Sequence, residues 1–284
     1  MSQADRAAHF RRLHATRPLV LPNAWDAASA RVIELAGAPA IASTSAGVSW
    51  SLGRSDGQRL ERAEMIEVIR RMVQAVTVPV TADIEGGYGS GSTADVAETV
   101  RAMIEVGAVG INLEDSPGLN GQVLLAPDRQ AERIRAARAA ARATGVDLVI
   151  NARTDVYLMQ AVPSGKRFDE SVRRGKLYLA AGADCLFVPG VVDAETIGAL
   201  VKAIDGPLNV MAGPGAPTTK RLGQLGVARV SVGPAITLAA LAATQRAARE
   251  LIDRGTYGAL EDAMPFGEVN SMFAVRSEAA APSR

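Results

Sequence analysis

Two acids stand one residue apart at the end of an apolar run, in the stretch VPVTADIEGGYG (78–89). Core strands normally avoid charge, because burying an unpaired carboxylate is costly or forces it to bind a proton. Asp83 and Glu85 therefore require a partner. A third acid, Glu114, stands near the end of the later apolar run VGINLED (109–115).

The polar residues of four apolar runs all fall on one face of their strands, because side chains alternate between the two faces. Those faces carry Thr81, Asp83 and Glu85; Asn112 and Glu114; Asn151, Arg153 and Asp155; and Asn209 with Met211. In a parallel barrel such a face points inward, toward the carboxyl end where active sites lie. We therefore expect four strand ends to meet at one site.

Three carboxylates at one site raise each other's pKa unless a cation neutralises them. Arg153 brings one positive charge, and a divalent metal would supply the rest. The ligands would be oxygen only, which favours Mg²⁺, with Mn²⁺ as the alternative, over Zn²⁺. We predict Asp83, Glu85 and Glu114 as metal ligands. The competing interpretation is that these acids cap helices or pair with arginines at the rim.

Arg153 itself has two interpretations. It could be a structural partner of Asp155 or Glu114, or a bidentate clamp on a substrate carboxylate or phosphate, and we favour the clamp. The segment STSAGVSWSLGRSDG (43–57), which contains Asp56, has small residues that let backbone N–H groups approach an anion. Taken alone, it is an ordinary Ser/Gly-rich loop.

Other catalytic arrangements are excluded. Cys185 lies in a predicted buried strand and is interpreted as a core residue, and His9 and His14 lie in the N-terminal segment, far from the strand ends. No Cys–His or Ser–His–Asp arrangement is credible. A Walker A loop and a dinucleotide-binding glycine fingerprint are absent from the sequence.

Eight short apolar runs alternate with Ala- and Arg-rich stretches of helical period. The predicted strands are 18–22, 39–44, 78–85, 109–115, 147–155, 184–190, 207–213 and 228–234. The predicted helices are 25–36, 61–75, 93–106, 128–144, 168–181, 193–204, 218–225 and 235–254. Eight β-then-α units imply a (β/α)8 barrel, with a doubly wound open sheet as the competitor.

The composition is that of a globular protein, with 284 residues, 48% hydrophobic and 21% charged residues. We expect one barrel domain over 1–284, with the barrel core at about 18–240 and a C-terminal helical extension over 241–284. A net charge of +1 favours neither nucleic acid nor a membrane as a partner. One cysteine allows no internal disulfide, and the N-terminus lacks a signal peptide, which together predict a cytoplasmic protein.

The motifs TSAG, ADIEGGYG, INLEDS, INARTD and LNVMAGPG, in this order, resemble the isocitrate lyase/phosphoenolpyruvate mutase superfamily over residues 18–240. The resemblance implies a Mg²⁺-dependent barrel that cleaves or forms C–C or P–C bonds beside a carboxylate, through a metal-bound enolate. It also implies a homotetramer, a dimer of dimers that exchanges a C-terminal helix between subunits.

The resemblance further implies roles for individual residues. The metal-site acids are Asp56, Asp83, Glu85 and Glu114. The backbone of Ser45, Ala46 and Gly47 would hold the substrate carboxylate, and Asp83, Arg153 and Asn209 would also contact the substrate. Asp56 and Arg153 are the predicted catalytic residues.

Departures from the family pattern limit the reactions that the protein could catalyse. The sequence EDSPGLNGQVLLAPDRQ has no Lys, Cys or His between 116 and 128, where relatives carry a proton donor. The acid that lyases of the family tend to place after the sixth strand is replaced by Val188, Pro189 and Gly190, and Glu85 stands where many relatives have Asp. A metal-stabilised enolate alone would support decarboxylation or retro-aldol cleavage of a small di-acid.

Two other functions stay open. One is P–C bond chemistry on phosphonopyruvate or phosphoenolpyruvate, as a mutase or hydrolase, although the Lys and Asn of those enzymes are missing. The other is a non-catalytic protein that binds α-oxo acids. In each case the segments 86–92 and 116–127 are predicted to close over the site.

Overall fold

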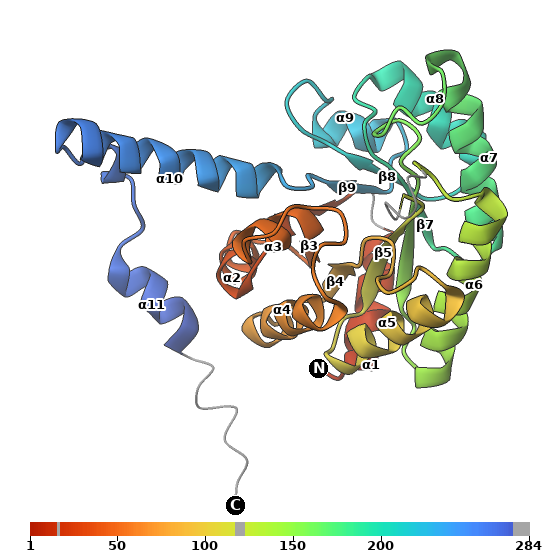
Figure 1. Cartoon of the computed structure of the whole chain (residues 1–284), viewed down its shortest axis with the longest axis horizontal. Helices are drawn as coiled ribbons and strands as arrows, with labels where there is room; N and C mark the ends of the chain where they lie inside the picture. The colour runs from red at the N-terminus through yellow and green to blue at the C-terminus, as the bar shows by residue number, and fades with distance from the viewer. Residues whose placement is uncertain (16–17, 117–122, 275–284) are drawn as a thin grey trace, which may run out of the picture.

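The computed structural model describes residues 1–15, 18–116 and 123–274. Within them, nine short parallel strands form one sheet in the order β1-β9-β8-β7-β6-β5-β4-β3-β2 (Figure 1). The strands are β1 (Leu19–Leu21), β2 (Asn23–Ala24), β3 (Ile41–Ser43), β4 (Val80–Asp83), β5 (Gly110–Glu114), β6 (Val149–Arg153), β7 (Cys185–Val188), β8 (Leu208–Met211) and β9 (Arg229–Ser231).

The sheet closes through its first two strands. β1 pairs with β9 and β2 pairs with β3, and only Pro22 separates them. Proline has no N–H to donate, so it interrupts the hydrogen-bond ladder within what is one barrel strand. The sheet is therefore an eight-stranded parallel barrel, which confirms the (β/α)8 prediction and rejects the open doubly wound sheet.

Seven helices follow the barrel strands at the predicted places, each within about two residues of the predicted bounds. They are α2 (Ala27–Leu35), α4 (Arg62–Ala75), α5 (Thr93–Glu105), α6 (Pro127–Thr144), α7 (Arg167–Ala180), α8 (Ala194–Ile204) and α9 (Thr219–Gln224). A left-handed glycine caps α6, where Gly145 (φ 75°) donates its N–H to the Arg142 carbonyl. This is the C-cap chemistry that the sequence indicated.

Helix α1 (Gln3–Leu13) was not predicted, and it covers the amino end of the barrel. A capping box between Ser2 and Asp5 starts the helix. Its Phe10 is fully buried in a cluster with Leu19 and Val109, which lie at the starts of their strands. The N-terminal segment thus closes the end of the barrel opposite the predicted site.

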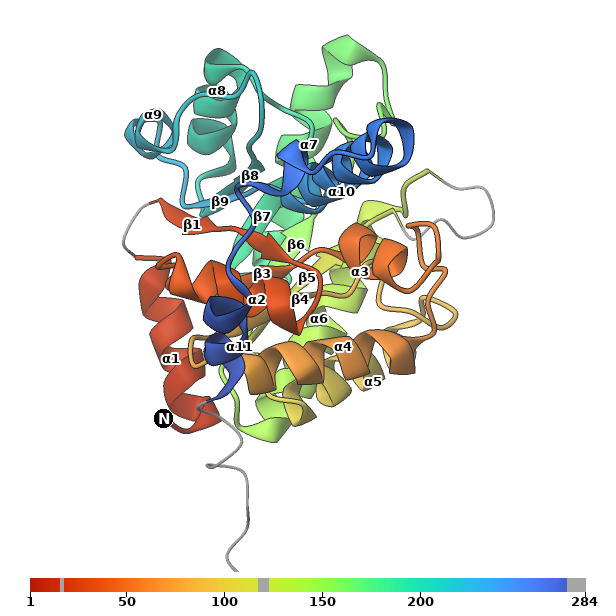
Figure 2. The same cartoon turned by 90° about the vertical axis from the view of Figure 1, so that its left-hand side faces the viewer.

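Helix α10 (Ala235–Arg254) matches its predicted range and extends away from the barrel as an arm, and α11 (Phe266–Ala274) follows from the far end of this arm (Figures 1 and 2). Along the arm large apolar side chains are exposed, with Ile252 at 81% and Phe266 at 85%. Arg31 of α2 donates to the Met272 carbonyl, so α11 contacts the barrel. None of the described helices is long and apolar enough to cross a membrane.

Candidate active site

The carboxyl ends of the strands surround two adjoining cavities of about 170 and 280 Å³. Asp83 and Asn112 line the smaller cavity, and Glu85, Glu114 and Asp155 line the larger one. Both cavities share Ser45, Asp56, Arg153 and Leu158. The structure therefore brings the predicted acids, the arginine and the 43–57 segment together at one opening. These two cavities at the carboxyl ends of the strands form the carboxyl mouth.

Asp83 is the last residue of β4, and it is held by the segment that follows β3. Its Oδ2 accepts hydrogen bonds from the Ser45 backbone N–H (3.2 Å) and the Ser45 hydroxyl (2.9 Å). The Asp83 N–H donates to the Ser43 hydroxyl at 2.7 Å. These contacts fix the carboxylate at the base of the mouth, with 7% of the residue exposed.

The 43–57 segment is not simply a loop, because its first part is the helix α3 (Ser45–Ser51). A β-carbon added at Gly47 would lie 2.6 Å from the Thr237 hydroxyl and 2.8 Å from the Trp25 Cβ. The glycine is thus required by the close packing of α3 against α10, and its φ is not in the left-handed region. The backbone N–H groups of residues 45–47 lie in the first turn of this helix, where intrahelical acceptors are lacking.

Glu85 does not have the backbone conformation of a strand. The predicted alternation of side chains along β4 therefore ends at Asp83. The φ of Glu85 is 48°, and the two residues it contacts, Gln58 (φ 55°) and Tyr88 (φ 60°), are also left-handed. The Glu85 carboxylate accepts hydrogen bonds from the Gln58 N–H and, at 3.3 Å, from the Tyr88 hydroxyl. Left-handed non-glycine residues are uncommon, and their clustering is typical of functional sites.

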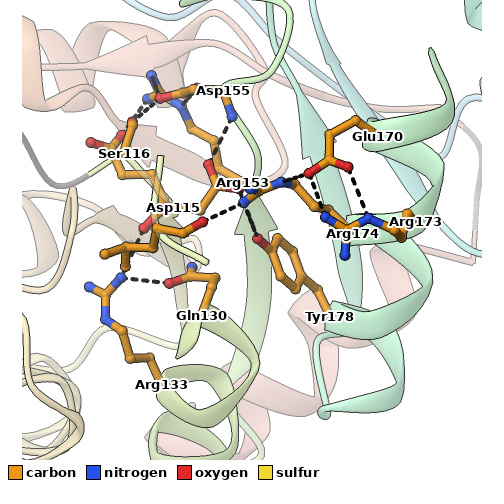
Figure 3. Close-up of polar contacts among 12 residues, drawn as sticks. Asp115, Ser116, Gln130, Arg133, Arg153, Asp155, Glu170, Arg173, Arg174 and Tyr178 are labelled. Atoms are coloured by element: carbon orange, nitrogen blue, oxygen red, sulfur yellow. Dashed lines mark hydrogen bonds and ion pairs between the residues drawn. The ribbon is translucent and has the colours of Figure 1, made fainter. Parts of the chain in front are cut away.

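Arg153 ends β6 between two acids, as Figure 3 shows for Asp155. Its Nε and Nη2 donate to Asp155 at 2.6 and 3.1 Å, and its Nη1 lies 2.9 Å from Glu114. The guanidinium carbon lies 5.8 Å from the centre of the Phe187 ring. Arg153 therefore pairs with both Asp155 and Glu114, as one of the two interpretations of the sequence expected. The same side chain also lines both cavities.

The five acids of the mouth, Asp56, Asp83, Glu85, Glu114 and Asp155, face a single arginine among the described residues that line the two cavities. Burial, followed by the charge of Asp83, raises the pKa of Glu85 to about 7 and raises the pKa of Asp56. Burial also raises the pKa of Glu114 well above its usual range, against the opposing charge of Arg153. The mouth therefore lacks the positive charge that would keep all five carboxylates ionised.

A divalent cation would supply this missing positive charge, and the donors are oxygen atoms, as Mg²⁺ or Mn²⁺ requires. In the part of the chain that the structure describes, however, no three Asp, Glu, His or Cys side chains are grouped closely enough to hold a metal ion. The acids are held apart by other partners, because Glu114 pairs with Arg153 and Glu85 accepts a hydrogen bond from the Gln58 N–H. The metal ligands stay a prediction.

Asn209 lies deeper than the mouth. It is fully buried on β8, two residues before Met211, which lines the smaller cavity, and it lines neither cavity itself. The Ser231 hydroxyl donates to its Oδ1 at 3.4 Å, while its Nδ2 has no hydrogen-bond partner among the described residues. Its proposed contact with a substrate stays a prediction.

Nine lining residues of the smaller cavity were not predicted from the sequence as site residues, and Asn23, Thr44, Asn112 and Phe187 are among them. Strand parity did place Asn112 on the inward face with Glu114, although Asn112 was given no role in the site. Parity gives no such signal for Phe187, because Phe187 lies beside Arg153 through the register of β6 and β7. Of the predicted closing segments, residues 117–122 lie outside the described residues, and the Gly87 carbonyl in 86–92 accepts a 2.7 Å hydrogen bond from Thr99.

Comparison with known proteins is consistent with this geometry. Residues 10–252 match the family model of phosphoenolpyruvate phosphomutase. A 2,3-dimethylmalate lyase from Eubacterium barkeri is 31% identical over 210 residues, which cover 71% of this chain and 69% of the relative.

Two solved structures have the same fold over nearly the whole chain. A protein from Burkholderia cenocepacia J2315 is 41% identical, with a TM-score of 0.88 and 96% of each chain covered. An oxaloacetate acetylhydrolase in complex with its product oxalate is 25% identical, with a TM-score of 0.85 and again 96% of each chain covered.

Proposed function

This chain belongs to the isocitrate lyase/PEP mutase superfamily, and on that premise we propose that it is a Mg²⁺-dependent lyase of a small α-oxo or α-hydroxy dicarboxylate. The observation that carries the proposal is Arg153, which lines both cavities while two acids hold its guanidinium. The Nε and Nη2 edge of this guanidinium already binds Asp155, so a substrate carboxylate would accept from the remaining N–H groups of Nη1 and Nη2.

A second carboxylate would bind at the first turn of α3, through the backbone N–H groups of residues 46 and 47, since the Ser45 N–H already donates to Asp83. The smaller cavity also has an apolar wall, formed by Leu158, Phe187, Met211 and Pro234. An alkyl branch of a substituted malate would pack against that wall. The dimethylmalate lyase and the oxaloacetate acetylhydrolase, by their names, act on short di-acids of this kind.

The acids Asp83, Glu85 and Glu114 would hold Mg²⁺, which when bound supplies the positive charge that stabilises developing negative charge on the substrate. Arg153 orients one carboxylate so that the scissile bond lies beside the acids. Asp56 lines both cavities, and its raised pKa lets it keep a proton more readily than an ordinary carboxyl group. It is therefore our candidate to return a proton to the carbanion that cleavage leaves.

P–C bond chemistry is the second candidate function, and the match to the phosphoenolpyruvate phosphomutase family favours it. The same arginine and the same acids would serve a phosphonate as well as a carboxylate. Against it stands the segment 116–128, which lacks Lys, Cys and His. A protein that binds α-oxo acids without turnover is the third candidate.

The test is steady-state turnover on a panel of oxaloacetate, 2-methylmalate, 2,3-dimethylmalate, methylisocitrate and phosphonopyruvate, with Mg²⁺ and with EDTA. We expect Mg²⁺-dependent release of an oxo acid from oxaloacetate or a substituted malate, and poor cleavage of methylisocitrate. Conversion of phosphonopyruvate alone would establish the second candidate. Tight binding without turnover across the panel would establish the third.

We further propose a homotetramer, in which α10 and α11 pack against another subunit. The exposed apolar side chains of Ile252 and Phe266 support it, because monomers rarely expose a long row of such residues. Light scattering on the intact chain and on a chain that ends at residue 254 is the test. Loss of the tetramer in the shortened chain is expected, and a monomeric intact chain contradicts the proposal.

A further inference from the structure

We propose that Asp115 is a positioning residue which, with Arg174 and Tyr178 of α7, holds Arg153 in its orientation toward the mouth (Figure 3). The inference rests on the proposed function only in giving Arg153 a substrate carboxylate to bind. Asp115 directly follows β5, yet its side chain points away from the two cavities and lines neither of them.

One side of the Asp115 carboxylate is anchored to α7. Its Oδ2 accepts hydrogen bonds from Arg174 Nη1 at 2.9 Å and from the Tyr178 hydroxyl at 2.8 Å. Asp115 and Tyr178 are fully buried and Arg174 is 6% exposed. Hydrogen bonds of this kind, to a buried charge, are strong and hold their geometry.

The anchor is itself fixed on its other sides. Arg174 Nε donates to Glu170 at 2.7 Å, and Arg174 Nη1 also donates to the Leu125 carbonyl at 2.9 Å. The Leu125 N–H in turn donates to the Asp115 carbonyl at 2.8 Å. Arg174 therefore keeps a carboxylate partner in Glu170 even when Asp115 is changed.

The other side of the carboxylate reaches the substrate arginine through Asp155. Asp155 lies two residues beyond the end of β6, outside the ladder, and its N–H donates to Asp115 Oδ1 at 3.0 Å. The Asp155 carboxylate then accepts two bonds from Arg153, at 2.6 and 3.1 Å. Two donors of Arg153 are bound to the Asp155 carboxylate. The position of the Asp155 backbone therefore determines the orientation of the guanidinium.

A matched arrangement lies at the opposite end of the same strand. Asp184 accepts the Ile150 N–H at 2.7 Å and pairs with Arg11 and Arg138. It thus resembles Asp115 in holding one backbone N–H of the β6 region and in binding buried or half-buried arginines. Ile150 carries no charged side chain, so Asp184 stabilises the barrel without reaching the mouth.

The experiment compares Asp115→Asn with Asp184→Asn, alone and in an Arg153→Ala background, by calorimetric titration of oxalate with Mg²⁺ present. Both substitutions are expected to lower the melting temperature. Only Asp115→Asn is expected to raise the Kd of oxalate, by about tenfold, the equivalent of one weakened charge-assisted hydrogen bond. In the Arg153→Ala background it should add less than about twofold, because the two positions act through one interaction.

Equal effects of the two Asp→Asn substitutions on Kd, or full additivity with Arg153→Ala, would overturn the proposal. Crystal structures without ligand give a readout that does not depend on the function. In Asp115→Asn we expect the Arg153 guanidinium to leave Asp155, and an unchanged guanidinium would also overturn the proposal. If the wild-type chain binds no oxalate, the proposed function is in doubt, and the crystal structures still decide the positioning role.

Tyr178→Phe serves where Asp115→Asn fails to fold, because it removes one hydroxyl and keeps the Arg174 pair. It is expected to shift Kd and the guanidinium in the same direction by a smaller amount, about twofold to threefold in Kd. A Tyr178→Phe protein with wild-type oxalate affinity and an unmoved Arg153 counts against the proposal.

Discussion

The two ends of the barrel solve the problem of buried charge in opposite ways. At the amino end, Asp184 pairs with Arg11 and Arg138, and α1 covers the strand starts with the fully buried Phe10. At the carboxyl mouth, five acids share one arginine, and burial raises the pKa of Glu85 to about 7. The acid at the amino end has two arginine partners, whereas the acids of the mouth outnumber their one arginine.

This difference separates stability from function within one fold. Satisfied ion pairs and apolar packing stabilise the native state, whereas an uncompensated cluster of carboxylates destabilises it until a cation binds. The mouth also contains the left-handed residues Gln58, Glu85 and Tyr88. Substitutions at the amino end should therefore change stability alone, and substitutions at the mouth should change binding and can even increase stability.

The largest effect is expected from Asp83→Ala at the mouth. Removal of this acid should reduce Mg²⁺ affinity by about 100-fold or more, since even the loss of an outer partner of a metal site costs about 10- to 100-fold. The fold should persist, because the site lies at the ends of the strands. Calorimetric titration with Mg²⁺ measures this, and an unchanged affinity would show that Asp83 is not a ligand.

Phe10→Ala tests the amino end. The lost side chain is fully buried, so the free energy of unfolding should fall by about 3 to 4 kcal/mol. KM and kcat of the folded protein should stay at wild-type values. Urea denaturation and steady-state kinetics check both statements, and a change in KM larger than about twofold would break the separation between the two ends.

Glu85→Gln should make stability depend less on pH. The folded pKa of about 7 lies above the unfolded value of 4.5, so the unfolded chain binds fewer protons between these values. Stability of the metal-free protein therefore falls as pH rises from 4.5 to 7, by at most about 3 kcal/mol. The variant lacks this fall.

Urea denaturation in EDTA at pH 4 and pH 8 measures the effect. The variant should equal the wild type at pH 4 and exceed it at pH 8, and Mg²⁺ should abolish the advantage. If both proteins show the same profile, the carboxylate of Glu85 is not the source of the pH dependence.

Arg153→Lys keeps the positive charge and removes the planar fork. A lysine can make only single-point contacts, so kcat/KM for the di-acid should fall by about 10- to 100-fold, the value of one or two charge-assisted hydrogen bonds. Kinetics on the substrate found in the panel are the measurement. A wild-type rate in the lysine variant would show that charge alone, without the fork, is sufficient.

Cys185→Ala is expected to have the smallest effect. The thiol is fully buried at the start of β7, below the mouth, and its replacement should cost about 1 kcal/mol of stability. Activity should be unchanged. A folded Cys185→Ser protein that binds metal and is inactive would show that the thiol takes part in the reaction.

The alternation of side chains in the sequence determined much of this protein. Short apolar runs located the barrel strands apart from β2, periodicity of 3.6 located the helices that follow them, and parity placed Asp83, Arg153 and Glu114 on inward faces. These are local properties, because the conformation of a strand decides where each of its side chains points. The first helix, which lies outside the repeating β-then-α pattern, was missed.

Only the tertiary structure decided which of these groups meet. Nothing near Asp115 in the sequence indicates that its partners are Arg174 and Tyr178, which lie 59 and 63 residues away. Glu85 leaves its strand because Gln58 and Tyr88 hold its carboxylate, and Phe187 lies against Arg153 because two strands pair in a given register. Local pattern sets the direction of a side chain, whereas its partner depends on strand register and helix packing, which join residues that are distant in the chain.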